Sequence, residues 1–83
     1  MKPAEARRLA EAYSLEELAH AASHLGNEED PEIAIAGEDH GEKLTHVLLA
    51  MRIRERVELA GDPLREAFRA VMAEVRHVLT NEE

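Results

Sequence analysis

The stretch from residue 40 to residue 60 constrains the fold most, because it reads as one long helix that is apolar on two sides. At helical spacing the apolar residues form two nearly opposite stripes, Leu44–Val47–Leu48–Met51 and Leu49–Ile53–Val57–Ala60. A helix with two apolar faces is sandwiched between neighbours. In a chain of 83 residues we expect one of those neighbours to be another subunit. After Met51 the first stripe is interrupted by Glu55 and Glu58 while the second continues, so we expect the second stripe to face that subunit.

Helical periodicity and end signals predict further helices on both sides of this one. Residues 3–13 and 14–26 each place apolar residues on one face, and Ser14 with Glu17 forms a capping box at the start of the second. Asp39 and Glu42 form a similar box before residue 40. The last helix, residues 63–79, follows a Gly-Asp-Pro stop and is amphipathic, with Leu64, Phe68, Val71, Met72, Val75, Val78 and Leu79 on one face.

Residues 27–40 form the one long stretch without a helical pattern. Ile33 and Ile35 would point the same way in an extended segment at residues 32–36. Two interpretations stay open. The segment either pins a loop onto the helical core through its two isoleucines, or pairs as a strand with the same segment of a second subunit across a two-fold axis.

The size of the chain predicts a single domain, residues 1–83, with a small core. There are 14 alanines, one Phe, one Tyr, no Trp and no Cys. A domain this short buries about 60% of its unfolded surface. Without disulfides, such a core usually needs a metal or a partner subunit. We therefore expect an oligomer, most simply a homodimer, and the absence of Cys fits the cytoplasm.

The charge excludes some classes of partner. Residues 1–42 carry 11 acidic and three basic residues, whereas residues 43–83 carry seven of each, so the net charge of −8 belongs to the first half. No Lys or Arg occurs between Arg8 and Lys43. Phosphate binding needs a basic face, which argues against nucleic acid. A basic protein or a cation is compatible with this charge. No segment has the roughly 20 apolar residues of a membrane span.

One cluster of residues could bind a metal. Glu38, Asp39, Glu42 and His46 lie around the start of the long helix, and carboxylates with an imidazole can coordinate a divalent cation. The same acids can instead cap the helix, where negative charge is favoured. His46 can instead be a buried, hydrogen-bonded residue.

Two weaker patterns also contain histidine. Glu16, His20 and His24 form one stripe of the second helix, where an exposed polar face is the simpler interpretation. Glu74 and His77 have the Glu-x-x-His spacing of ferritin-like di-iron bundles, whose second copy a homodimer could supply by symmetry. There is no thiol nucleophile and no phosphate loop, and the serines have no base and orienter pattern, so we expect a non-enzymatic protein.

Three segments carry a family resemblance: Ala36 to Leu48, Tyr13 to Leu18, and Phe68 to Val75. They resemble short bacterial proteins of unknown function with the motif GED-x-GE-x-LTHVL, and the resemblance covers nearly the whole chain. Those relatives have an acid where this chain has His40, which weakens any cation site that uses a carboxylate there. The resemblance implies no assigned activity. It does imply gene neighbourhoods with thioredoxin-like and peroxiredoxin genes, and hence an accessory role in such a system as one hypothesis.

The sequence therefore predicts an all-α bundle of three to four helices with a short extended segment at 32–36. The leading functional hypothesis is a non-enzymatic oligomeric interaction or assembly module. The alternatives are a metal-binding helical protein with a site completed between subunits, and the redox accessory protein.

Overall fold

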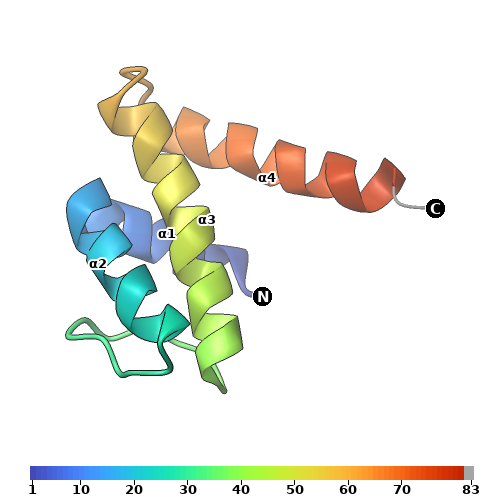
Figure 1. Ribbon diagram of the computed structural model, residues 1–83. Coiled ribbons are helices and arrows are strands. Elements are labelled where there is room, and N and C mark those ends of the chain that lie inside the picture. Colours follow the sequence, from blue (N-terminus) through green and yellow to red (C-terminus); the bar gives the residue numbers. More distant parts are fainter. Residues whose placement is uncertain (82–83) are drawn as a thin grey trace.

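The protein is an all-α bundle of four helices (Figure 1). The computed structural model describes the backbone of residues 1–81 and the side chains of residues 1–76. The helices are α1 (Pro3–Ala12), α2 (Leu15–Gly26), α3 (His40–Glu58) and α4 (Leu64–Asn81). No strand occurs among residues 1–81, which confirms the all-α prediction. Val78 and Leu79, predicted on the apolar face of α4, have side chains outside the described set.

Helix α3 is the centre of the bundle, and the other three helices pack against it. In Figure 1, α1 lies behind α3 and α2 lies beside it, while α4 crosses its C-terminal end and projects away from the body. Apart from α3, α4 contacts α1 only weakly. Both apolar stripes of α3 therefore contact other helices of the same chain. Part of the α3 surface nevertheless remains exposed.

The burial of the two apolar stripes of α3 differs from what the sequence predicted. Ile53, from the second stripe, is fully buried, so this stripe faces the core of its own chain. In the first stripe Val47 is fully buried, whereas Leu48 is 47% exposed. The part of α3 left open to a partner therefore lies around Leu48, and not along the second stripe as we expected.

The core is small and rich in alanine. Its largest fully buried side chains come from all four helices: Leu9, Leu18, His46, Val47, Ile53 and Val71. Among residues 1–76, five of the twelve buried hydrophobic residues are alanines, which allow close helix approach but bury little area. Phe68 packs at the edge of this core, where the Arg7 guanidinium lies 5.3 Å from its ring centre.

The helix ends follow the predicted caps with one difference. The Ser14 hydroxyl accepts from the Glu17 amide at 3.2 Å and the Glu17 carboxylate accepts from the Ser14 amide at 2.9 Å, so the capping box is complete. Asp39 caps α3 by accepting from the Glu42 amide at 2.8 Å. The Glu42 carboxylate, however, accepts from the Glu38 amide one residue earlier.

One ion pair at the end of α3 serves the junction between α1 and α2. The Arg54 guanidinium donates to the Ala10 carbonyl in the last turn of α1, at 3.3 Å. Its partner Glu58 accepts from the Leu15 amide at the start of α2, at 3.0 Å. Positive charge therefore meets a helix C-terminus and negative charge a helix N-terminus, the favourable arrangement for both. Glu58, which interrupts the apolar stripe, has a structural role here.

The segment 32–36 is a loop, not a strand, and it packs onto its own chain. Ile35 joins the core at 9% exposure, and Ile33 is half-buried. The backbone groups that a second strand would need are bonded within the chain: the Ala34 carbonyl accepts from Arg8, and the Ala36 amide donates to Glu5. This arrangement matches the first of the two interpretations of the segment.

Candidate functional site

His46 is the one buried polar or charged residue among the described side chains, with no exposed surface. Its Nδ1 lies 2.8 Å from the Ala36 carbonyl oxygen, and its Nε2 accepts from the Lys2 amide at 2.9 Å. A carbonyl requires a donor and an amide requires an acceptor, so the ring is neutral with its proton on Nδ1. Neither nitrogen is left to bind a metal.

Two of the three acids predicted to join His46 in a metal site, Asp39 and Glu42, serve the start of α3 instead, and Glu38 contributes its backbone amide there. Asp39 and Glu42 are bonded to backbone amides as described above, and the other oxygen of Glu42 lies 3.8 Å from the Met1 ammonium. The hydrogen bond from the Glu38 amide holds the pKa of Glu42 below its ordinary value. Among the described residues no group of three or more His, Asp or Glu side chains is placed to hold a metal ion. This geometry does not support the predicted site, which stays a prediction from sequence.

The other histidines that the structure describes contact nearby side chains. His24 lies 3.1 Å from Glu29, His40 lies 3.2 Å from Asp30, and the rings of His20 and His24 meet edge to face at 4.8 Å. These contacts tie the 27–39 loop to α2 and α3.

The glutamate of the Glu-x-x-His pattern on α4 also forms ion pairs within the chain. Glu74 accepts from Arg52 of α3 at 2.6 Å, which lowers its pKa, and lies 3.7 Å from Arg56. This carboxylate joins α4 to α3. The side chain of His77 lies outside the described residues.

A clamp between α1 and the loop is the strongest local electrostatic feature, and sequence spacing does not indicate it. The Arg8 guanidinium donates to both oxygens of Glu5, at 2.8 and 2.7 Å, and also to the Ala34 carbonyl. Glu5 in turn accepts from the Ala36 amide at 2.9 Å. The bond from Arg8, with that from Ala36, lowers the pKa of Glu5 to about 2. The backbone partners of Arg8 and Glu5 lie 26 and 31 residues away along the chain, so the spacing of the two residues does not indicate them.

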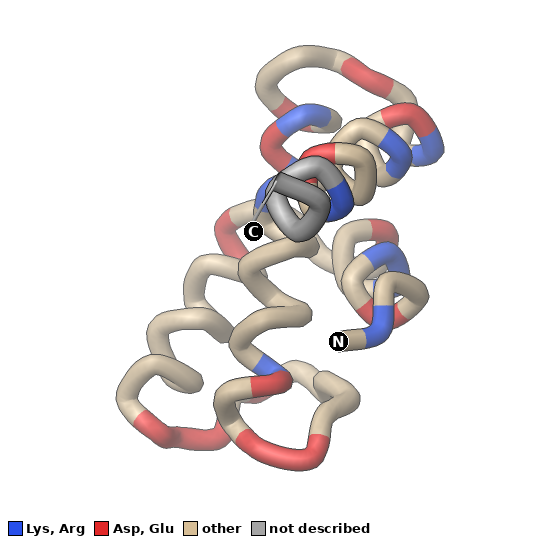
Figure 2. The backbone as a smooth tube through the Cα atoms, turned by 90° about the vertical axis from the view of Figure 1, so that its right-hand side faces the viewer, with Lys and Arg blue, Asp and Glu red and all other residues tan. Residues whose placement is uncertain are grey.

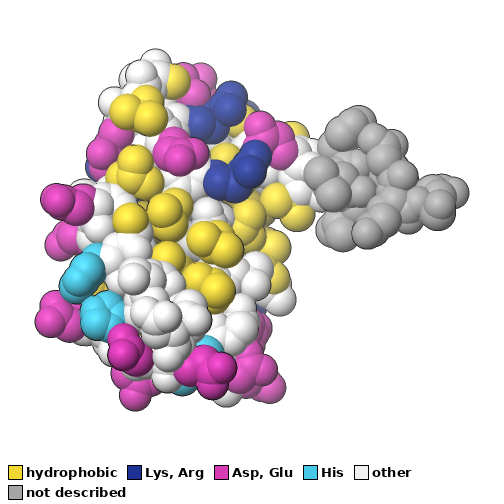
Figure 3. Space-filling model, in the orientation of Figure 1, with side chains coloured by type: hydrophobic (Ala, Val, Ile, Leu, Met, Phe, Trp, Pro, Cys, Tyr) yellow, Lys and Arg dark blue, Asp and Glu magenta, His cyan; other side chains and the backbone are white. Residues whose placement is uncertain are grey.

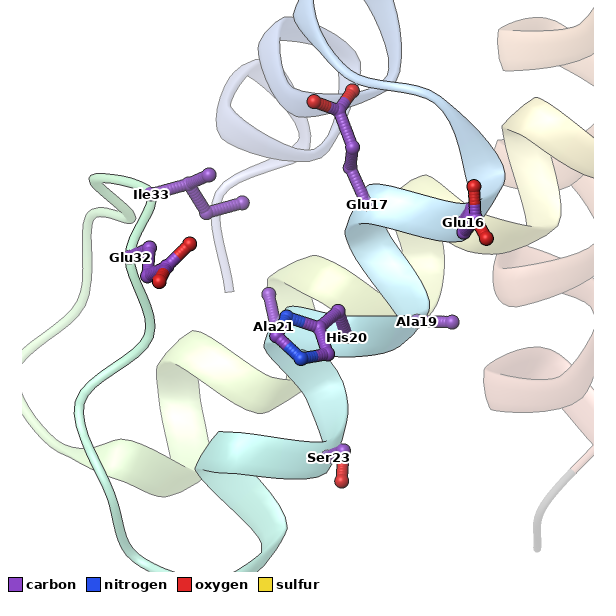
Figure 4. Close-up of a pocket in the computed structure, with 8 residues that line it drawn as sticks. All are labelled: Glu16, Glu17, Ala19, His20, Ala21, Ser23, Glu32 and Ile33. Atoms are coloured by element: carbon purple, nitrogen blue, oxygen red, sulfur yellow. The ribbon is translucent and has the colours of Figure 1, made fainter.

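The clamp holds one wall of an open groove between α2 and the loop (Figure 4). The groove has a volume of about 570 Å³. Figure 4 shows Ile33 and Glu32 on the loop side, facing His20 and Glu17 of α2. Its lining consists of three carboxylates, one imidazole and four small or apolar residues: Glu16, Glu17, Ala19, His20, Ala21, Ser23, Glu32 and Ile33.

A second groove, of about 490 Å³, lies between α4 and the start of the chain. It is mostly apolar, and its charged residues are arginines. The lining residues are Met1, Pro3, Phe68, Arg69, Met72, Val75 and Arg76. This groove exists because α4 extends beyond the part of the body that could cover its apolar face.

The two grooves lie in regions of opposite charge. Figure 2 shows Asp and Glu gathered at the lower end, around the loop after α2, with most Lys and Arg on α1, on α4 and at the end of α3. Between Arg8 and Lys43 the sequence has no basic residue other than histidine. On the face shown in Figure 3, apolar side chains gather over α3 between α2 and α4.

These features define a small four-helix protein with a histidine-bonded loop and two open grooves, in which none of the described helices is long and apolar enough to cross a membrane. Residues 1–80 match a family of unknown function, DUF6952, and the chain belongs to that family. The resemblance to a family of unknown function is thus confirmed. No curated protein and no solved structure matches the chain significantly.

Proposed function

We propose that the protein is a non-enzymatic assembly module that acts as a homodimer, with α4 carrying the contact between copies. The observation that supports it is the apolar groove under α4. Phe68, Met72 and Val75 line this groove and are only partly covered by their own chain. Covering apolar surface contributes about 25 cal/mol per Å², so a second copy that filled the groove would stabilise both chains.

The composition of the core supports the same proposal. A domain of this size has a thin stability margin, and alanines, which bury little area each, make up a large share of the described core residues. Of the two features that predicted an oligomer from sequence, the 32–36 segment packs onto its own chain, and the second stripe of α3 buries Ile53 there and leaves Leu49 and Val57 partly buried. The argument for a dimer therefore moves to α4 and to the open face of α3.

The cytoplasm is the expected location, on the ground of the cysteine-free composition alone. Metal binding at Glu38, Asp39, Glu42 and His46 and an accessory role in a thioredoxin or peroxiredoxin system stay hypotheses from sequence. No contact in the described part of the chain favours either of them over assembly.

The mass in solution tests the proposal directly. Light scattering across the micromolar range should give the mass of two chains for the wild type. Met72→Glu places a charge in the α4 groove and should give a monomer, with the dissociation constant raised at least about tenfold. Val75→Glu, further along α4 from the body, should act in the same way.

Leu59→Glu is the matched control, since Leu59 is 78% exposed near the end of α3 and lies outside both grooves. It should remain a dimer, and circular dichroism should show all variants to be folded. A wild type that is monomeric throughout this range contradicts the proposal.

A further inference from the structure

We infer that α4 of one copy docks into the groove between α2 and the 27–39 loop of the other copy. This inference rests on the proposed dimer and names the two surfaces that meet. Around a two-fold axis the contact occurs twice, because each copy supplies one α4 and one groove.

The α2 groove has the form of a receiving surface for a helix. Ala19 and Ser23 are small, exposed and one turn apart, so a second helix can approach α2 closely. Ile33 supplies an apolar contact from the loop side, where Figure 4 shows it across from His20. The bonds of Glu5 and Arg8 to Ala34 and Ala36 hold this wall in place, so little ordering of the loop is needed on docking.

Helix α4 has the matching form, since it projects from the body (Figure 1). Arg65, Arg69, Met72 and Arg76 recur at i, i+4, i+7 and i+11, and so form one stripe along it. Arg65 and Arg69 are exposed, and Phe68 and Val75 flank the stripe with partly buried apolar surface. The projecting helix therefore presents an apolar ridge edged with arginines.

Charge complementarity favours this groove over two other surfaces of the second copy that α4 could contact. The rim carries Glu16, Glu17 and Glu32, and within the described residues neither Glu16 nor Glu32 forms an ion pair. Two α4 helices packed on each other would instead bring arginine stripes together, which is unfavourable. The open face of α3 around Leu48 presents Arg52, which Glu74 of the same chain already pairs, and not a cluster of carboxylates like the rim of the groove.

Paired charge reversals test the contact by light scattering. The groove variant Glu16→Lys/Glu32→Lys leaves the Ser14–Glu17 capping box intact, and the helix variant is Arg65→Glu/Arg69→Glu. Each variant alone should be monomeric, with the dissociation constant of its dimer raised at least about tenfold. An equimolar mixture should form a heterodimer, because the native α4 of the first variant meets the native groove of the second. Glu11→Lys/Glu55→Lys makes the same charge change outside the groove and should remain dimeric.

Ionic strength gives an independent readout. Raising NaCl from about 50 to about 500 mM should weaken the wild-type dimer several-fold, because exposed charges are screened; an apolar contact is not weakened in this way. A dimer that survives both charge reversals but is lost in Met72→Glu would overturn the inference and leave the proposed dimer through α4 standing. A wild type without self-association would remove both.

Discussion

At the scale of single residues, the His46 side chain hydrogen-bonds to two backbone groups, as a neighbouring strand does in a β-sheet. It supplies a donor to the Ala36 carbonyl and an acceptor to the Lys2 amide, two backbone groups 34 residues apart. A buried imidazole is tolerated because both of its nitrogens are bonded. This is also why a residue typical of metal sites has no lone pair left for a metal here.

Replacement of His46 by Phe should destabilise the fold by about 1–3 kcal/mol, because it keeps the ring volume but leaves the partly buried Ala36 carbonyl and Lys2 amide without their partner. Urea denaturation followed by circular dichroism measures the change. His20→Phe on exposed α2 surface is the control and should shift stability by less than about 0.5 kcal/mol. Equal effects of the two substitutions would show that the His46 bonds contribute nothing measurable.

At the scale of helices, local sequence signals determine where helices end, and contacts between distant residues determine other parts of the structure. The Ser14 box ends one helix and starts the next within two extended residues, and Gly61, at φ 77°, separates α3 from α4. Gly37 is needed for a different reason, because a Cβ there would meet the Lys43 side chain at 2.8 Å. Each of these positions terminates or joins helices in the way that its residue type favours.

Loss of the Ser14 cap should weaken α2 selectively. Ser14→Ala removes the acceptor for the Glu17 amide and should cost about 1 kcal/mol of unfolding free energy, whereas Ser14→Asp should retain most of it. Ser23→Ala, an exposed position in the same helix, provides the comparison and should be close to neutral. If Ser14→Ala is as neutral as Ser23→Ala in denaturant titrations, the cap does not stabilise the helix in solution.

The helices could be predicted from sequence because their evidence is local. Periodicity and caps place the ends of α2 and α3 within a residue or two of those observed. The site could not be predicted in the same way. Glu42 and His46 were identified as chemically capable residues, but the partners that occupy them include the Met1 ammonium and the Lys2 amide, more than 40 residues away. Spacing along a helix carries no information about such contacts.

At the scale of the molecule, carboxylates hold the elements to one another. Glu5 joins α1 to the loop, Glu58 joins α3 to α2, and Glu74 joins α4 to α3. Hydrogen bonds and neighbouring arginines lower the pKa of each of them. The acidic composition therefore contributes to stability as well as to surface charge.

Stability should consequently fall on acidification. The folded pKa of Glu5 is about 2 against an ordinary value of 4.5, so its contribution is complete above pH 4.5 and is lost as the pH falls toward 2. Glu58 and Glu74 change in the same direction. Urea midpoints should be constant from pH 7 to about 5 and decline below about 4.5. Glu5→Gln should flatten that decline, whereas Glu11→Gln should leave it unchanged; identical curves for the two would contradict the role of Glu5.

The bond from Lys2 to His46 has a consequence for how the molecule opens. The first backbone amide of the helical body and the loop at residue 36 are fastened to the same imidazole, and Glu5 fastens them a second time. Fraying of α1, which would ordinarily be independent and nearly costless at a chain terminus, is therefore coupled to release of the loop. Because that loop forms a wall of the α2 groove, α1, the loop and the groove belong to one cooperative unit that opens or closes together.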